Sequence, residues 1–267
     1  MTQGTISGSD SIGTEAGDRS GFADVNGVHM YYELHGQGTP LVLLHGGMLT
    51  IDLNFAGLIP TLSRTHLVIG VEMQGHGRTA DIKRAITPAA LAEDVVGLLD
   101  HLDIDRAHVL GHSMGAAVAL ELAVNHPTRV RSIVPISGSV RPDGMHEDLT
   151  DPAKQATSTR MPTQQDFADF RDAYLRLSPH PDHFDAFLAA LSSSNADLRG
   201  WSDEQLAGIT APTLLIIGDH DFVTIEHAAL MKHLIPGAAL AVLPNTTHMT
   251  ATKRANLLLP MLAEFLD

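Results

Sequence analysis

The sequence predicts an α/β fold in which a mostly parallel, doubly wound sheet of eight strands carries an inserted block of helices. Two observations predict it. Short apolar runs alternate with amphipathic helical patterns, and runs that are apolar on both faces are typical of parallel strands covered by helices. The alternation stops only between residues 140 and 207, where we find no convincing strand. Strands that alternate with helices favour right-handed crossover connections.

Eight runs have the character of strands. Two of them, at 22–26 and 28–34, are separated by Gly27 and are expected to form a hairpin at the edge of the sheet. The other six are expected to form its parallel part. They are LVLLH at 41–45, LVIGV at 67–71, AHVLG at 107–111, SIVPIS at 132–137, TLLIIG at 213–218 and ALAVL at 239–243.

Two of the helices between these strands have readable ends. In the stretch 87–103, Thr87 can cap the helix, Pro88 suits its first turn, and the apolar side chains fall on one face. A second helix is expected to start at Met114 and to stop before Pro127.

The stretch from 140 to 207 is expected to form a helical cap over one end of the sheet. It contains a helical pattern at about 163–177, another at about 182–194, and a short one that Ser202 opens with Gln205 as a capping box. Its aromatic side chains either line a pocket for an acyl or aromatic group or pack the cap on the core.

Domain organisation follows from these patterns. Residues 21–139 and 208–267 are expected to form the core, and residues 140–207 the cap. Residues 1–20 are rich in Gly, Ser and Thr and have little apolar surface, so a flexible tail is expected there.

Composition argues against several classes of function. The 267 residues include 17 Lys and Arg against 31 Asp and Glu, a net charge of −14, which argues against nucleic acid and anionic membranes as partners. No uncharged apolar run approaches the ~18 residues of a spanning helix, and the first residues lack the pattern of a secretory signal. We expect a soluble protein in the cytoplasm that acts on a small molecule. Because there is no Cys, disulfides, thiolate metal sites and a Cys nucleophile are excluded.

The strongest chemical signal is Gly-His-Ser-Met-Gly at 111–115, between a buried strand and a helix. In this context G-x-S-x-G predicts a tight turn that lifts Ser113 above the sheet as a nucleophile. Gly111 and Gly115 suit a close approach of strand and helix, and the helix start directs N–H groups to the place where an oxyanion would form. The alternatives are a structural serine and a phosphate-binding turn.

A serine nucleophile needs a base and a carboxylate later in the chain. Asp219 and Asp221 follow a strand at the sheet end where Ser113 is expected, and His248 follows the next strand. The order Ser, Asp, His is that of one class of hydrolases and differs from two protease orders. The chain has 16 His residues, and His248 is distinguished from the others by its place after the strand that follows Asp221.

Four motifs resemble those of the α/β-hydrolase superfamily, in its group of small bacterial esterase-like and cofactor-free haloperoxidase-like enzymes with a helical cap. The resemblance covers about residues 21–267. The motifs are LLHGGM at 43–48, MQGHGRT at 73–79, LGHSMG at 110–115, and GDHD with TTHM near the end.

The resemblance implies an α/β-hydrolase fold in which Ser113 is the nucleophile and His248 is the general base and then the acid. Asp221 would orient His248, because relatives use the second carboxylate of a G-D-x-D sequence, and Asp219 would be a loop residue.

The resemblance also implies an oxyanion hole made by the backbone N–H groups of Gly47 and Met114. His45 would support the loop that contains Gly47. One position departs from the family pattern, because Glu72 stands where relatives have Asp, and the longer acid is expected to hold the loop that follows.

No cofactor or metal is expected. The pairs His108/His112 and His180/His183 lack the arrangement of a metal site, and the turn after LVLLH lacks G-x-G-x-x-G spacing. The expected reaction is hydrolysis of an ester, thioester or lactone through an acyl-enzyme. Carbon–carbon bond hydrolysis, perhydrolysis and a non-catalytic receptor of the same fold stay as alternatives. The sequence does not fix the oligomeric state.

Overall fold

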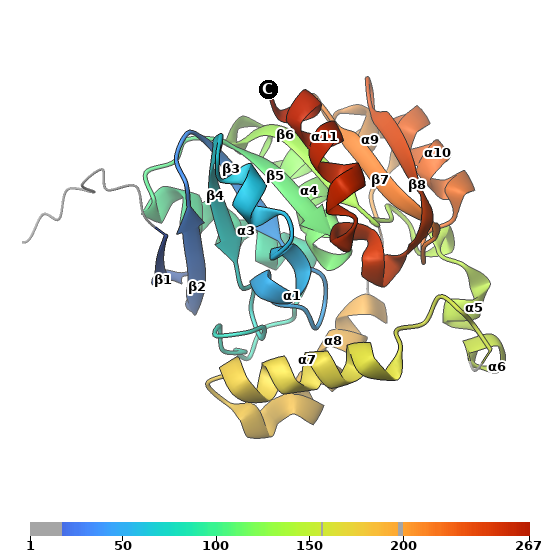
Figure 1. Cartoon of the computed structure of the whole chain (residues 1–267), viewed down its shortest axis with the longest axis horizontal. Helices are drawn as coiled ribbons and strands as arrows, with labels where there is room; N and C mark the ends of the chain where they lie inside the picture. Colours follow the sequence, from blue (N-terminus) through green and yellow to red (C-terminus); the bar gives the residue numbers. More distant parts are fainter. Residues whose placement is uncertain (1–17, 156, 197–199) are drawn as a thin grey trace, which may run out of the picture.

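One sheet forms the centre of the molecule. The computed structural model describes residues 18–155, 157–196 and 200–267. The sheet has eight strands in the order β1-β2-β4-β3-β5-β6-β7-β8; β2 runs antiparallel to both of its neighbours, and the other pairs are parallel (Figure 1). The strands are β1 (Arg19–Val25), β2 (Val28–His35), β3 (Thr39–Leu44), β4 (His66–Val71), β5 (Ala107–His112), β6 (Val130–Ile136), β7 (Leu214–His220) and β8 (Ala239–Thr247). The predicted fold class is confirmed, and each predicted run overlaps one strand.

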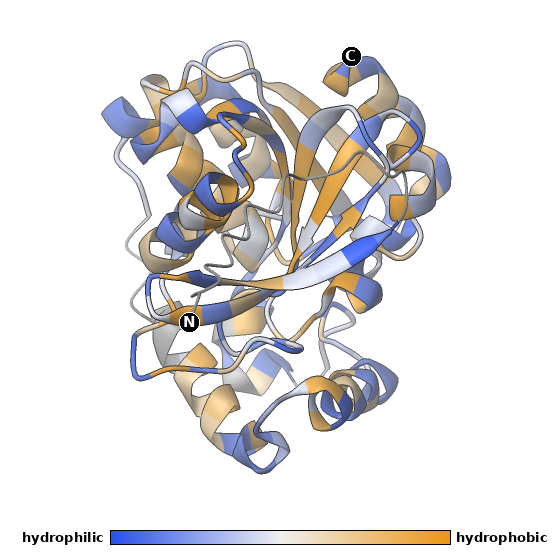
Figure 2. Cartoon of the chain, turned by 90° about the vertical axis from the view of Figure 1, so that its left-hand side faces the viewer, coloured by the Kyte–Doolittle hydropathy of each residue, from blue (hydrophilic) through white to orange (hydrophobic). Residues whose placement is uncertain are grey.

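Helices cover both faces of the sheet with two separate apolar clusters. The larger cluster includes side chains of α3 (Pro88–His101), α4 (Met114–Asn125) and α10 (Ile225–Leu234). The other includes α1 (Ile51–Phe55), α2 (Ile59–Leu62) and α11 (Ala255–Leu266). Figure 2 shows the hydrophobic colour concentrated in the inner strands between these layers.

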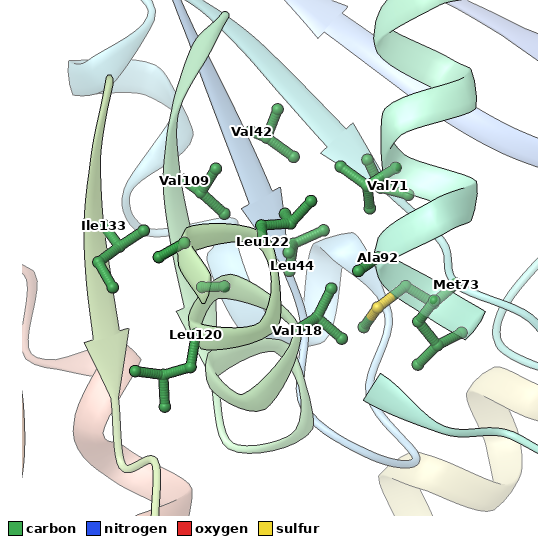
Figure 3. Packing of buried hydrophobic residues seen from close by; sticks show 14 of the residues in the cluster. Val42, Leu44, Val71, Met73, Ala92, Val109, Val118, Leu120, Leu122 and Ile133 are labelled. Carbon is green, nitrogen blue, oxygen red and sulfur yellow. The ribbon is translucent and has the colours of Figure 1, made fainter. Parts of the chain in front are cut away.

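The larger cluster fixes the helix that follows Ser113. Figure 3 shows Val42, Val109 and Ile133 of the sheet against Val118 and Leu122 of α4. All five are at most 1% exposed. Burial of this side of α4 holds the N-terminus of the helix against the ends of β3 and β5.

A run of helices is inserted between β6 and β7. Figure 1 shows α7 and α8 together beyond one end of the sheet, where aromatic side chains of the two helices stack. The inserted helices are η2 (Pro142–Gly144), α5 (Glu147–Thr150), α6 (Pro152–Gln155), α7 (Gln164–Leu177), η3 (Pro181–His183), α8 (Phe184–Ala196) and α9 (Asp203–Ala207). Thr163 caps α7, and the capping box predicted at Ser202 and Gln205 is confirmed.

Two boundaries differ from the prediction. Residues 1–17 of the expected tail lie outside the described residues, but Arg19 and Ser20, also expected there, pair with Leu34 and Glu33 in β1. An edge strand needs only backbone partners on one side, so polar residues can extend it. The α8 helix starts at Phe184, two residues later than expected, because Pro181–His183 forms a 3₁₀ turn.

Within the described residues, no helix combines the length and the apolar character that a membrane span requires.

Candidate active site

Ser113 lies in a strained turn between β5 and α4. Its φ of 53° is in the left-handed region, and its N–H donates to the carbonyl of Ile136 at 2.9 Å. Glycine is required on both sides. A Cβ on Gly111 would lie 2.0 Å from the Gly115 carbonyl oxygen, and a Cβ on Gly115 would lie 2.0 Å from that of Leu44. The sequence motif thus produces the tight strand–turn–helix geometry predicted for it.

Three predicted side chains come together in one chain of contacts. Ser113 Oγ lies 2.9 Å from His248 Nε2, and His248 Nδ1 lies 2.7 Å from Asp221 Oδ1. Since a carboxylate only accepts, Nδ1 donates to Asp221, and Nε2 is left to accept the Ser113 hydroxyl proton. His248 is 4% and Asp221 1% exposed. This is the arrangement of a nucleophile, a base and an orienting acid.

The pairing of β7 with β8 brings the acid and the base together. After a register shift near Gly218, His220 pairs with Thr247, so the residues that follow, Asp221 and His248, start from neighbouring positions. Both strands extend further than the sequence predicted, to His220 and Thr247. The site therefore depends on main-chain register as well as on the side chains.

Asp219 was interpreted as a loop residue, but it lies in β7, one residue before the end of the strand, and binds the end of β8 that leads to His248. Its two carboxylate oxygens accept the N–H groups of Asn245 and Thr246, both at 2.9 Å. The Thr246 bond is the main cause of the lowered pKa of Asp219. Asp219 makes no contact with His248 in the described part of the chain, so Asp221 is the carboxylate placed at the imidazole.

Asp221 is held as an anion by several donors. Its Oδ2 accepts from Ser137 Oγ at 2.5 Å and from the Gly218 N–H at 3.0 Å, and its Oδ1 accepts from the Phe222 N–H at 2.7 Å. Burial by itself would raise its pKa, but the charge of His248 and these hydrogen bonds lower the pKa of Asp221 to about 2.

Two backbone N–H groups of residues that line the same cavity as Ser113 have no hydrogen-bond partner among the described residues. Gly46 N–H donates to Asn54 Oδ1 at 2.8 Å, and Met48 N–H donates to His76 Nε2 at 3.1 Å. The Gly47 N–H between them, and the Met114 N–H at the start of α4, have no hydrogen bond within residues 18–155, 157–196 and 200–267. These are the two groups that the resemblance assigned to an oxyanion hole.

Neutral imidazoles hold the loops near Gly47. His45 Nδ1 donates to the Gly46 carbonyl and its Nε2 accepts the Met73 N–H; His76 Nδ1 donates to the Gln74 carbonyl. Burial lowers the pKa of His76 to about 4, and it lowers the pKa of His45 well below the usual value. His45 is thus placed as a loop support and lies away from the position of a base.

Glu72 closes the loop after β4, as expected from its place in the motif. The carboxylate accepts from Arg78 N–H at 2.6 Å and from Arg78 Nη1 at 2.8 Å, and a Cβ on Gly77 would lie 2.2 Å from it. Burial raises the pKa of Glu72.

Asn54 and Ser137 also support the site, and the sequence did not predict either role. Asn54 Oδ1 also faces His112 Nδ1 at 3.2 Å, and Asn54 Nδ2 donates to Thr252 Oγ1 at 2.8 Å. Asn54 lies in a five-residue helix that has no readable pattern. Ser137 was interpreted as the end of a strand, although its φ of 57° makes it a turn residue.

A cavity of about 430 Å³ opens at Ser113 between the sheet and the inserted helices. Its lining is mostly apolar and includes Met114, Phe170, Leu191 and Trp201. Among the described residues, no group of three His, Asp or Glu side chains is arranged to hold a metal ion.

Comparison with known proteins agrees with this geometry. The family model described as "alpha/beta hydrolase fold" matches residues 39–181, which include the loop with Gly47 and the turn with Ser113. The chain belongs to the alpha/beta hydrolase family. The resemblance predicted from the four motifs is confirmed.

Relatives within this family have varied names. The chain is 30% identical over 82% of its length to the putative carbamate hydrolase RutD of Azorhizobium caulinodans, of which it covers 88%. It is also 30% identical, over 88% of its length, to the dihydrolipoyllysine-residue acetyltransferase component of an acetoin cleaving system from Cupriavidus necator. The chain spans 66% of the length of that component, slightly less than two thirds.

Among solved structures, Est816, titled an N-acyl homoserine lactone degrading enzyme, matches with a TM-score of 0.67 and 26% identity. The match covers 90% of this chain and 98% of Est816.

Proposed function

We propose that this protein is a serine hydrolase that cleaves a carboxylic ester, thioester or lactone of a small organic substrate. The observation that carries the proposal is the chain of contacts from Ser113 Oγ through His248 to Asp221, at 2.9 and 2.7 Å, which ends in a mostly apolar cavity. A carbamate and a lactone, named for two of the similar proteins, are both acyl compounds, which supports acyl-group chemistry.

In the proposed reaction, Ser113 Oγ attacks the carbonyl carbon while its proton passes to His248 Nε2. The N–H groups of Gly47 and Met114 hold the oxyanion of the tetrahedral intermediate, and each contributes a few kcal/mol to lowering the barrier. The leaving alcohol or thiol takes the proton from His248 as its bond to carbon breaks. Water then attacks the acyl-enzyme with His248 as base, which releases the acid and restores Ser113.

Two tests address this proposal. We expect turnover of p-nitrophenyl esters, and we expect Ser113→Ala to reduce kcat by at least ~10³-fold without loss of the fold. A fluorophosphonate should label the protein once, at Ser113, as shown by peptide mass analysis. An unchanged rate in Ser113→Ala, or a label on another residue, would contradict the assignment.

The same tests separate the alternatives. A panel of esters, thioesters, lactones and 1,3-diketones distinguishes acyl transfer from carbon–carbon bond cleavage, and added peroxide detects perhydrolysis. Binding without turnover of any member would favour a receptor. The cytoplasmic location stays a prediction.

A further inference from the structure

Phe222 lies against the imidazole of His248. It follows Asp221 directly, and the two rings stack face to face, with centroids 3.8 Å apart and planes inclined by 8°. Phe222 and His248 both line the cavity. A substrate in the cavity would therefore meet Phe222 next to the base.

A second ring also packs against His248. His112 lies with its centroid 5.0 Å from that of His248, and its Nε2 donates to the His248 carbonyl at 3.1 Å. The torsion that turns an imidazole about its bond to Cβ has broad minima, so the plane of His248 depends on packing as well as on the hydrogen bond of Nδ1 to Asp221. Phe222 and His112 provide that packing.

Residues inserted between β6 and β7 contact the main chain around Phe222. The Phe222 carbonyl accepts the His146 N–H at 2.8 Å, and Met145 forms an antiparallel bridge with Val223. Arg160 Nε donates to the Asp221 carbonyl at 3.1 Å. Three contacts from residues 145–160 thus fix the main chain on which the Phe222 ring is mounted.

We propose that Phe222 is a positioning residue for His248: its ring fixes the plane in which Nε2 faces Ser113, and its π face stabilises the positive charge that the imidazole gains when Ser113 reacts. A cation over an aromatic face is attracted by the ring quadrupole. The inference rests on the proposed function, because His248 gains charge only if Ser113 is the nucleophile.

Labelling by a fluorophosphonate tests the inference without knowledge of the substrate. In this reaction the Ser113 oxygen bonds to phosphorus, fluoride leaves, and the hydroxyl proton passes to His248. Phe222→Leu keeps apolar bulk but removes the flat face, and we expect its labelling rate constant and its kcat for an ester to fall about tenfold, part of what a positioned base contributes. Phe222→Tyr keeps the face and is expected to stay within about twofold of wild type in both.

Phe170→Leu is the matched control. Phe170 also lines the cavity and is 4% exposed, but it lies on α7, and its ring contact is with Phe167. Its loss should raise KM and weaken binding of the probe, but it should leave the labelling rate constant at saturating probe near the wild-type value. Thermal unfolding midpoints of all variants confirm that labelling is measured on folded protein.

The outcomes are distinct. The inference is overturned if Phe222→Leu labels at the wild-type rate, or if Phe222→Tyr is as slow as Phe222→Leu. A wild-type protein that neither labels nor hydrolyses esters would overturn the proposed function itself.

Discussion

Neutral imidazoles join the main chain at residues 45–48 to that at residues 73–74, whereas carboxylates hold the main chain near His248. On the first side, His45 and His76 connect backbone groups of residues 45–48 with those of residues 73–74. On the second side, Asp219 and Asp221 bind backbone N–H groups and the imidazole. We call these the oxyanion side (residues 45–48 and 73–76) and the acid–base side (residues 218–223 and 244–249, which include the ends of β7 and β8).

The difference reflects what each side must do. A neutral imidazole donates from one nitrogen and accepts at the other, so it fixes two backbone groups without adding charge where an oxyanion would form. A carboxylate places negative charge beside the imidazole, which becomes positive in the proposed reaction. Separate supports allow each side to be perturbed alone.

The largest expected effect is on the acid–base side. Asp221→Asn keeps the shape but removes the charge, and kcat should fall by about 10³ to 10⁴-fold. Asp219→Asn is the matched control, two residues away near the end of β7; it keeps one acceptor and should cost about 1 kcal/mol of stability and only a few-fold in kcat. Equal losses of kcat in the two variants would show that the structure assigns the wrong carboxylate.

On the oxyanion side, His76→Ala should reduce kcat by about 10²-fold. The Met48 N–H loses its acceptor, so the neighbouring Gly47 N–H is no longer fixed toward the oxyanion. His183→Ala, in an exposed 3₁₀ turn, is the control and should have no effect. A loss seen in KM alone would indicate that His76 shapes the cavity instead.

The two sides should also lose stability in different pH ranges. The pKa of buried His76 is about 4, below its unfolded value near 6.5, so its contribution is complete above pH 6.5 and is lost as the pH falls toward 4. The free energy of unfolding at pH 5 should therefore be lower by about 2 kcal/mol than at neutral pH because of His76. The pKa of Asp221 is about 2, so its contribution persists until the pH falls below about 4.

Urea unfolding at a series of pH values measures this separation. Between pH 7 and 5, the midpoint of His76→Gln should change less than that of wild type. If the urea midpoint changed equally with pH in the two proteins over this range, His76 would not be the group responsible for the loss of stability.

The smallest expected effect is that of Ser137. Ser137→Ala removes a donor to Asp221, which raises the pKa of Asp221 and should lower kcat about fivefold. Ser137→Gly loses the same donor but fits the φ of 57°, so it should match Ser137→Ala in kcat and exceed it in stability by up to about 1 kcal/mol. If Ser137→Gly retained full kcat, backbone geometry and not the hydroxyl would be the cause.

Local pattern was sufficient for most of the fold. The six runs predicted for the parallel part of the sheet are short and mostly apolar, and Thr87, Thr163 and Ser202 cap helices as their spacing predicted. The short helices α1 and α2 were not predicted, because four or five residues carry too little periodicity to recognise. Arg19 and Ser20 were misplaced because strand pairing, which depends on a distant partner, decides their conformation.

The residues of the candidate site could be predicted where their order in the chain and their place after a strand indicate their role. Ser113, Asp221 and His248 each follow a strand, and carboxyl ends of neighbouring parallel strands meet at one edge. Asn54, Ser137 and Phe222 gave no signal, because their roles depend on contacts that the fold creates. Their partners Thr252, Asp221 and His248 lie 198, 84 and 26 positions away in the sequence. The contacts of Asp219 with Asn245 and Thr246 could not be predicted either, because they depend on the register of β7 and β8.

The route of the chain around the inserted helices has a consequence for protein engineering. The chain leaves the sheet after Ile136 and returns at Leu214, on adjacent strands that pair at Ile136 and Ile216. Exchange of the intervening segment between relatives would therefore join two ends that already lie close together. A library of such chimeras that retains Ser137 and the contacts of His146 and Arg160 could vary the shape of the cavity while the hydroxyl, the imidazole and the carboxylate keep their supports.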